Sequence, residues 1–206
     1  IRIAADRNAD ATDVIPEWSD DLQVADGELG EIVIRGPVVT RSYKFEDGPT
    51  SAAKIPVSPS APGARPGEVW HRIGDIGYLD STGRIWFCGR KSHRIDTTFG
   101  TVLPVPIENI FNTNPIVFRS ALVGVGEVGA EDQVLIVQPT PGKMPRSAAA
   151  RAALARDLFD HVADAPATEH VVEILFKEDF PVDVRHNAKI HRGELKVWAT
   201  EQLRKS

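Results

Sequence analysis

The sequence lacks several features that would place it in a class at once. Cysteine occurs once, at Cys88, which excludes a disulfide framework and a multi-cysteine zinc site. No apolar run approaches the roughly 18 residues of a membrane-spanning helix. Basic residues do not outnumber acidic ones, 24 against 29, and the net charge is −5. A general nucleic-acid-binding surface needs a basic excess. We therefore expect a cytoplasmic protein without a nucleic-acid partner.

The first residues also lack the features of a chain start. Ile1 is not preceded by methionine, and no basic segment followed by an apolar one begins the chain. Residues 1–4 instead resemble a strand already in progress. We expect the chain to be the C-terminal piece of a longer polypeptide whose missing N-terminal part carries the rest of any active site. With 206 residues, 42% of them hydrophobic, the chain suits one domain plus part of another.

The first half of the chain is dominated by strand and turn signals. Residues 31–35 read as a strand that ends at Gly36-Pro37. Residues 49–66 are rich in proline, serine and alanine, which predicts a surface loop that joins no sheet. Residues 76–88 predict a β-hairpin, because an Asp-Ser-Thr-Gly turn separates two runs of aromatic and β-branched residues. The polar run 89–94 then predicts a domain boundary.

The second half alternates helix and strand. Helices are predicted at 104–112, from a cap at Ser147 to about residue 162, and at 194–203, with strands at 116–125, 133–138 and 171–176. Along the middle helix, Ala150, Leu154, Leu158 and Val162 recur every four residues. The pattern predicts the α+β class. We expect the tail of a β-rich larger domain over residues 1–90, then a small α+β domain over residues 91–206 with helices on one side of its sheet.

Four short motifs follow one another along the chain. Gly27-Glu28-Leu29-Gly30-Glu31-Ile32 begins a segment that reaches Tyr43, and His71 to Tyr78 contains a Gly-Asp turn. Gly89-Arg90 lies at the predicted boundary, and Asn187 to Arg192 reads Asn-Ala-Lys-Ile-His-Arg. Each motif alone is weak, but their order and separation are informative together.

In that order the motifs resemble those of the acyl-adenylate-forming superfamily of AMP-dependent synthetases and ligases. Two segments are similar to the β-lactone synthetases of bacterial long-chain olefin biosynthesis: residues Arg185 to Ile190 and the residues around Gly89. The resemblance implies ATP-dependent, Mg²⁺-dependent activation of a 2-alkyl-3-hydroxy fatty acid and closure to a β-lactone, with release of AMP and pyrophosphate. The implied partners are the acid substrate, the missing N-terminal part and other enzymes of the same lipid pathway.

The resemblance also assigns roles that suit the chemistry of individual residues. Asp75 offers two acceptor oxygens to a vicinal diol, and the resemblance implies the ribose hydroxyls of ATP. Arg90 offers a planar fork of donors to ribose or phosphate oxygens. Lys189, expected on a loop, is implied as the catalytic cation that bridges the carboxylate and the α-phosphate while charge develops. Ser92 is the favoured hinge, with Lys91 and His93 as alternatives.

Two positions depart from the superfamily pattern. Ile73 stands where most relatives have threonine, and Ala188 stands where glycine is usual before the lysine. A base is needed for ring closure, and either His186 or His93 is a candidate. The histidine spacings do not suit a metal pair, so no metal site is expected. An acyl-CoA synthetase or acyl-AMP ligase is the alternative reading, and a non-catalytic binding fragment is a lesser one.

Overall fold

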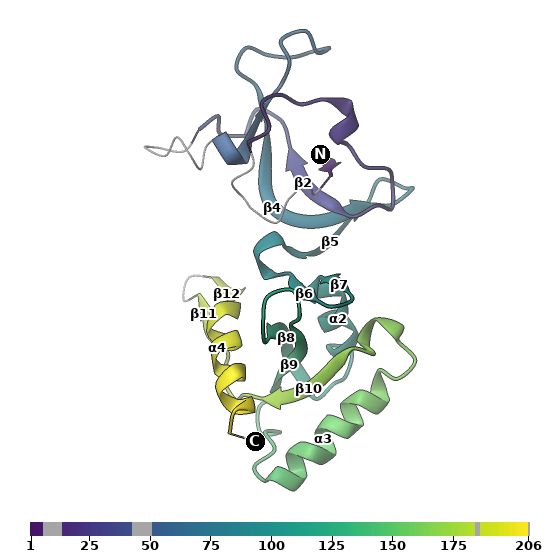
Figure 1. Ribbon diagram of the computed structural model, residues 1–206, viewed down its shortest axis with the longest axis vertical. Helices are drawn as coiled ribbons and strands as arrows, with labels where there is room; N and C mark the ends of the chain where they lie inside the picture. The colour runs from purple at the N-terminus through teal and green to yellow at the C-terminus, as the bar shows by residue number, and fades with distance from the viewer. Residues whose placement is uncertain (6–13, 43–50, 184–185, 206) are drawn as a thin grey trace. The chain divides into compact units, whose positions relative to one another are not determined.

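The computed structural model describes residues 1–5, 14–42, 51–183 and 186–205 (Figure 1). The chain divides into two compact units, Ile1–Ser92 and His93–Ser206. The boundary predicted from sequence lies at residues 90/91, and the assignment of residues 1–90 to a larger adenylating domain stays a prediction. Tyr43, at the end of the first motif's segment, and Arg185, the first residue of the segment compared with β-lactone synthetases, lie outside the described residues. Within the described part, no helix is long and apolar enough to cross a membrane.

A five-stranded antiparallel sheet forms the first unit. Its strands are β1 (Arg2–Ala4), β2 (Gly30–Ile34), β3 (Lys54–Pro56), β4 (Val69–Leu79) and β5 (Ile85–Arg90). The order is β1-β2-β4-β3, and β5 pairs with β4 as well. β4 is long enough to pair along one side with β2 and along the other with β3 first and then β5. The strand that carries the Gly-Asp motif is therefore central in this sheet.

The segment from 49 to 66 corrects one expectation. It was predicted to join no sheet, but β3 lies inside it and pairs with β4 through Lys54–His71, Ile55–Trp70 and Pro56–Val69. β3 lies at the sheet edge, where proline is tolerated because no neighbouring strand needs its missing N–H. Ile55 is fully buried beneath Trp70. Burial of this side chain outweighs the low strand propensity of its neighbours.

The predicted hairpin is confirmed as β4 and β5, joined by a turn at residues 80–84. The Asp80 carboxylate accepts hydrogen bonds from the Thr82 and Arg84 backbone amides at 2.9 and 3.0 Å. It also accepts one from Trp86 Nε1 at 2.9 Å, and the ring of Trp86 stacks on Tyr78. The Thr82 hydroxyl donates to the same carboxylate at 2.6 Å, and this hydrogen bond is the largest of the causes that hold the pKa of Asp80 well below its usual range.

The second unit is built on a three-stranded sheet in the order β10-β9-β8. β8 (Val117–Val125) and β9 (Asp132–Pro139) are antiparallel, whereas β10 (Val171–Phe176) is parallel to β9. The parallel pair requires a crossover, which α3 (Ala148–His161) and a 3₁₀ turn at Pro166–Thr168 supply. The prediction of an α+β fold is confirmed.

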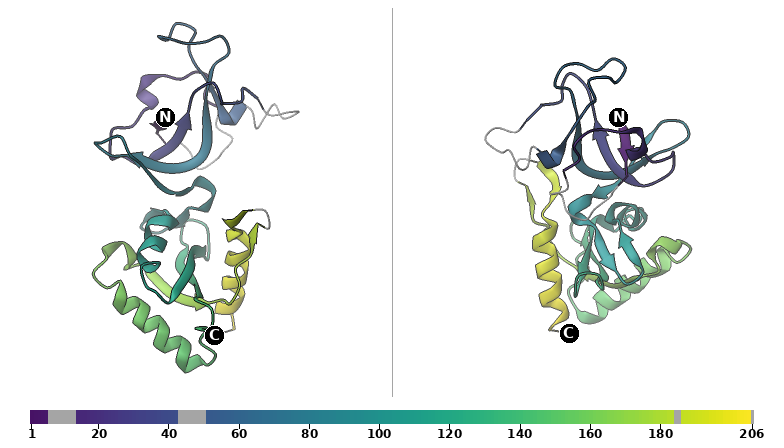
Figure 2. Two further views of the ribbon diagram at one scale, coloured as in Figure 1. Left: turned by 180° about the vertical axis from the view of Figure 1, so that it is seen from behind. Right: turned by 45° about the horizontal axis from the view of Figure 1, so that its top comes forward.

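Helices cover both faces of this sheet, not one face as predicted. α2 (Pro104–Phe111) and α3 pack on one face, where Phe111 and Leu158 meet Leu122 and Leu135. α4 (Arg192–Leu203) packs on the other, where Leu195 contacts the cluster that contains Ile136. Figure 2 shows α4, in yellow, and α3, in green, on opposite sides of the strands. The central residues 121–123 of β8 and 134–137 of β9 are apolar without alternation, because both faces of the sheet are buried there.

Apolar periodicity describes only part of α3. Ser147 caps the helix, as predicted, and its hydroxyl accepts a hydrogen bond from the Ala150 amide at 3.1 Å. Leu158 and Val162 are buried and Leu154 packs against them. Ala150 is exposed, which is contrary to the prediction. Ala150 belongs to neither apolar cluster of the unit.

Two small antiparallel pairs were not predicted. β6 (Ile95–Thr97) pairs with β7 (Gly100–Val102), directly after a 3₁₀ turn at Lys91–His93. β11 (Val182–Asp183) pairs with β12 (His186–Ile190). The expectation that Lys189 lies on a loop is therefore wrong, since the residue belongs to β12. Val182 and Ile190 pack against the core under α4, and this apolar attachment favours the strand pair.

Candidate active site

The Gly-Asp motif lies at an irregularity in the centre of β4. Glu31 of β2 pairs with Ile76, and Val33 pairs with Arg72, so one residue of β2 faces three residues of β4. Gly74 has φ +74° within this bulge. A left-handed backbone at this point favours glycine, because a Cβ would strain it. Bulges re-aim side chains near functional sites, and this one sets the direction of Asp75.

Asp75 and Arg90 are direct partners across the β4–β5 ladder. Arg90 Nε lies 3.0 Å from Asp75 Oδ1, and Arg90 Nη1 donates to the Ile73 carbonyl at 2.9 Å. The guanidinium therefore spans the bulge and contacts both of its ends. A Cβ added to Gly74 would lie 3.7 Å from Arg90 Nη1, an ordinary van der Waals distance, so the positive φ and not a lack of space favours glycine here. The structure thus places two of the predicted site residues side by side.

Only part of the Asp75 carboxylate faces solvent. Its side chain is 23% exposed, yet Oδ1 is fully shielded and accepts no hydrogen bond from the described residues. The Arg90 Nε contact at 3.0 Å is an ion pair without hydrogen-bond alignment. Burial raises the pKa of Asp75, and the charge of Glu31 adds to this while Arg90 opposes it. A hydroxyl ligand can therefore reach only the solvent-facing part of the carboxylate and not Oδ1, which faces Arg90.

Beneath this pair lies a buried charge cluster that sequence reasoning missed. Glu31 Oε2 accepts hydrogen bonds from Arg72 Nε at 3.0 Å and from Arg72 Nη2 at 2.8 Å. Lys91 Nζ lies 3.5 Å from the same oxygen. All three side chains are less than a tenth exposed. We call Glu31, Arg72 and Lys91 the charge cluster.

The charge cluster joins the motifs of the first unit. Glu31 comes from the first motif, Arg72 from the Gly-Asp motif, and Lys91 directly follows Gly89-Arg90. A signal for Glu31 exists in the sequence, because a glutamate inside a run of β-branched residues needs a partner when the strand is buried. The partner could not be identified, since Arg72 and Lys91 are 41 and 60 residues away.

The predicted hinge residues differ in their surroundings. Lys91 is buried in the charge cluster of the first unit. Ser92 is exposed, and the division between the two units falls directly after it. His93 is half-buried and has interaction partners. Of the three candidates, Ser92 has the most exposed environment.

Lys189 belongs to the second unit and is exposed on β12. Two residues later, the His191 amide donates to the Pro181 carbonyl at 2.9 Å, and α4 begins at Arg192. The side chains of His186 and Ala188 lie outside the described part of the chain. Among the described residues, no group of three or more His, Cys, Asp or Glu is placed to hold a metal ion.

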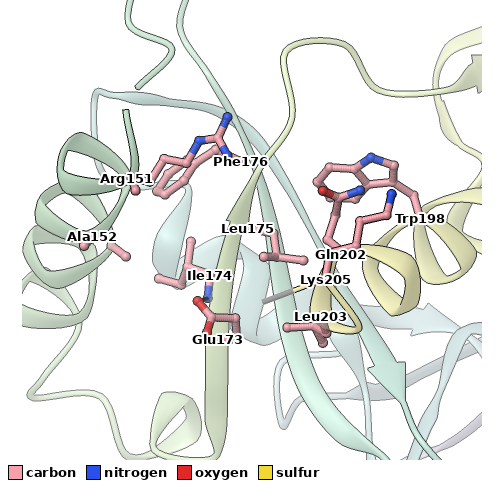
Figure 3. Close-up of a pocket in the computed structure, with 12 residues that line it drawn as sticks. Arg151, Ala152, Glu173, Ile174, Leu175, Phe176, Trp198, Gln202, Leu203 and Lys205 are labelled. Atoms are coloured by element: carbon pink, nitrogen blue, oxygen red, sulfur yellow. Dashed lines mark hydrogen bonds between the residues drawn. The ribbon is translucent and has the colours of Figure 1, made fainter. Parts of the chain in front are cut away.

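A cavity of about 480 Å³ lies in the second unit, between α3, β10 and α4. Figure 3 shows Arg151 and Ala152 on one side of β10, and Trp198 and Gln202 on the other. None of the predicted site residues lines it. It is an open groove lined by both acidic and basic residues, and no motif residue connects it to the predicted adenylation chemistry.

Sequence comparison finds curated relatives over nearly the whole chain. The chain is 45% identical over 188 residues to an olefin β-lactone synthetase of Xanthomonas campestris, which covers 91% of the chain and 33% of the relative. It is 41% identical over 191 residues to an olefin β-lactone synthetase of Stenotrophomonas maltophilia, which covers 93% of the chain and 33% of the relative. The chain thus spans one third of the length of these relatives. No family model matches it.

Structure comparison finds the same fold at lower sequence identity. The o-succinylbenzoate CoA synthetase of Bacillus subtilis, solved with an acyl-adenylate intermediate, aligns with a TM-score of 0.65 at 22% identity over 88% of the chain and 33% of that structure. An ATP-bound RpMatB-BxBclM chimera aligns with a TM-score of 0.68 at 22% identity, over 91% of the chain and 34% of that structure. At this identity the comparison establishes the fold.

The relatives confirm the resemblance predicted from the four motifs. The names of these relatives are those of β-lactone synthetases and of a CoA synthetase, in agreement with the predicted class of adenylate-forming ligases. Over nearly its whole length, the chain is similar to a segment that makes up one third of an olefin β-lactone synthetase.

Proposed function

We propose that the complete protein activates a 2-alkyl-3-hydroxy fatty acid with ATP and closes it to a β-lactone. The acid carboxylate attacks the α-phosphate, pyrophosphate leaves, and an acyl-AMP forms. The 3-hydroxyl oxygen then attacks the acyl carbonyl, its proton passes to a base, and AMP leaves as the ring closes. The observation that carries the proposal is the 45% identity to an olefin β-lactone synthetase over 91% of the chain.

In this proposal the first unit binds the nucleoside end of ATP. The solvent-facing part of the Asp75 carboxylate accepts hydrogen bonds from the ribose hydroxyls, and Arg90 next to it donates to ribose or phosphate oxygens. The charge cluster fixes the backbone near both residues, because Arg72 lies three residues before Asp75 and Lys91 directly follows Arg90. We expect Mg²⁺ to accompany ATP and assign no residue of this chain to the ion.

Lys189 is proposed as the catalytic cation of the adenylation step. Its side chain is exposed on β12, so the ammonium group is accessible to a ligand. A positive charge that is placed in advance stabilises the negative charge that develops on the phosphate oxygens. Such a contact acts in the transition state more than in the bound ground state, so it raises the rate more than the affinity.

Ring closure is favoured by the substrate itself. The 3-hydroxyl group is tethered to the carbonyl that it attacks, so a bimolecular step becomes intramolecular, and this advantage helps to offset the strain of a four-membered ring. AMP is a good leaving group, which makes the carbonyl electrophilic. His93 and His186 remain alternative candidates for the base. We also propose that the complete protein acts in the cytoplasm with other enzymes of the same lipid pathway.

Ser92 is proposed as the hinge between the two half-reactions, because hinges occupy a few positions at element ends. Ser92→Pro fixes φ at this position and is expected to slow turnover while the thermal unfolding midpoint stays unchanged. Ser81→Pro is the matched control, since Ser81 occupies the second position of the Asp80–Gly83 turn, where proline is favoured. Equal rates for Ser92→Pro and the parent in both half-reactions would rule out this hinge.

The proposed reaction is tested by AMP release from the complete protein with ATP, Mg²⁺ and no coenzyme A. A 2-alkyl-3-hydroxy fatty acid is expected to give many turnovers of AMP per enzyme. The matched acid without the 3-hydroxyl group is expected to stop after one acyl-AMP per site, because no internal nucleophile displaces AMP. An absolute requirement for coenzyme A with both acids would instead favour an acyl-CoA synthetase.

A further inference from the structure

The helix that follows Lys189 is fastened to the core of the second unit by two ion pairs. Arg192 and Lys196 lie one turn apart on α4, and each contacts a buried glutamate. Glu108 of α2 binds Arg192, and Glu131, directly before β9, binds Lys196. α4 is therefore held by directed polar contacts as well as by the apolar packing of Leu195 and Ala199.

The Arg192–Glu108 pair has the geometry of a fork. Arg192 Nη2 donates to Glu108 Oε2 at 2.7 Å, and Nη1 donates to Oε1. The same Nη1 lies 3.3 Å from the Leu122 carbonyl, while Glu108 Oε1 accepts a hydrogen bond from the Leu122 amide at 2.6 Å. Both side chains are largely buried. A bidentate pair of this type fixes direction as well as distance.

Arg192 is also the first residue of α4, three positions after Lys189. Between them, Ile190 packs on the core under α4, and the His191 amide is bonded to Pro181. The β11–β12 pair itself has two paired positions, Val182–Ile190 and Asp183–His186, with an irregularity between them. So short a ribbon has little stability of its own, and its position depends on what its ends are attached to.

We propose that Arg192 is a positioning residue, which holds β12 through Glu108 so that Lys189 presents its ammonium in one place. The proposal rests on the adenylation role of Lys189 proposed above. Arg192 touches neither substrate nor nucleotide in this account. It acts by anchoring the end of the ribbon to α2 and β8, and a shift of about 1 Å in a catalytic group is enough to cost on the order of 10²-fold in rate.

Arg192→Lys in the complete protein tests this role. Lysine keeps a cation beside the buried Glu108, so folding is retained, but it cannot make the fork or hold Leu122 at the same time. Arg146→Lys is the matched control, because Arg146 forms an equivalent fork with Glu178 on the exposed surface of the same unit. Both variants replace an arginine that forms a fork with a glutamate. The Arg192 fork is buried and lies next to β12, whereas the Arg146 fork is exposed.

Two readouts are expected to separate positioning from a general loss of stability. Arg192→Lys should lower the rate of acyl-adenylate formation about 10- to 100-fold, with little change in the KM for ATP. In a Lys189→Ala background the same substitution should have no further effect on the rate, because the group that it positions is gone. Arg146→Lys should leave the rate within about twofold of the parent.

Hydrogen exchange without substrate gives the second readout. The amides of Lys189 and Ile190 should exchange faster in Arg192→Lys than in Arg146→Lys, while amides of β9 keep their protection. Unchanged exchange at these amides would overturn the proposal whether or not the protein forms an acyl-adenylate. An equal loss of rate in the parent and Lys189→Ala backgrounds would also overturn it. If these amides do exchange faster in Arg192→Lys but the parent protein adenylates no acid, the proposed function is refuted and the positioning of β12 by Arg192 is not.

Discussion

Lys189→Ala in the complete protein is expected to lower acyl-adenylate formation on the order of 10²- to 10³-fold, the effect of removing one preorganised donor from a transition state. The side chain is exposed on β12, so its truncation leaves no cavity and no buried polar group. The loss should therefore appear in the rate and not in the stability. The measurement is acid-dependent release of pyrophosphate under saturating ATP.

The control for this variant is Lys143→Ala. Lys143 is an exposed lysine in a turn of the same unit and belongs to no motif. It should release pyrophosphate at the parent rate. ATP binding, measured by calorimetry without acid, should change little in Lys189→Ala, because the cation contributes mainly after charge develops. Pyrophosphate release at the parent rate in Lys189→Ala would show that another group performs this role.

Glu31→Gln is expected to destabilise the first unit by roughly 3–5 kcal/mol, the cost of removing one partner from a buried ion pair. Glu31 shares one oxygen between Arg72 and Lys91, and a neutral amide leaves both cations buried without the carboxylate. Three of the four tryptophans, Trp18, Trp70 and Trp86, lie in this unit. Denaturant unfolding of the chain followed by tryptophan fluorescence therefore reports on the change.

Asp20→Asn is the matched control for Glu31→Gln. Asp20 also pairs with an arginine of the first unit, Arg2 at 3.0 Å, but its side chain is 90% exposed. Exposed pairs contribute little to stability, so the unfolding midpoint should hardly move. A loss for Glu31→Gln no larger than that of the control would mean that the charge cluster does not stabilise the unit.

Much of the fold followed from local patterns in the sequence. The β4–β5 hairpin was predictable because Asp80 and Gly83 supply a turn whose hydrogen bonds are local. The strands and helices of the second unit were predictable because their apolar runs have the right length and period. In each case the residues that specify the element lie within it, so no knowledge of distant partners was needed.

The errors concern contacts made at long range. β3 is held by Trp70 of β4, so its proline-rich sequence gave no sign of pairing. The second helix-covered face was missed because continuous apolar strands do not reveal which helices lie on which side. β12 depends on the packing of Ile190 under α4, which its polar sequence hides. In β3 and β12, tertiary burial outweighed local propensity.

The candidate site divides in the same way. Asp75 and Arg90 could be singled out by motif, and the structure places them together across a ladder. Their binding of ribose stays a prediction. The charge cluster and the Arg192–Glu108 fork could not be identified, because each joins side chains more than forty residues apart. Each candidate ligand-binding residue can be singled out within one short motif, whereas each supporting contact joins residues from distant parts of the chain.

The central claim is the formation of a β-lactone, and NMR of the lipid product tests it most directly. The complete protein is incubated with ATP, Mg²⁺ and a 2-alkyl-3-hydroxy fatty acid, without coenzyme A, and the lipid is extracted. We predict the ring protons of a β-lactone in amounts equal to the AMP released. Recovery of unchanged acid under these conditions, with a coenzyme A thioester as the only product once coenzyme A is added, would contradict the claim.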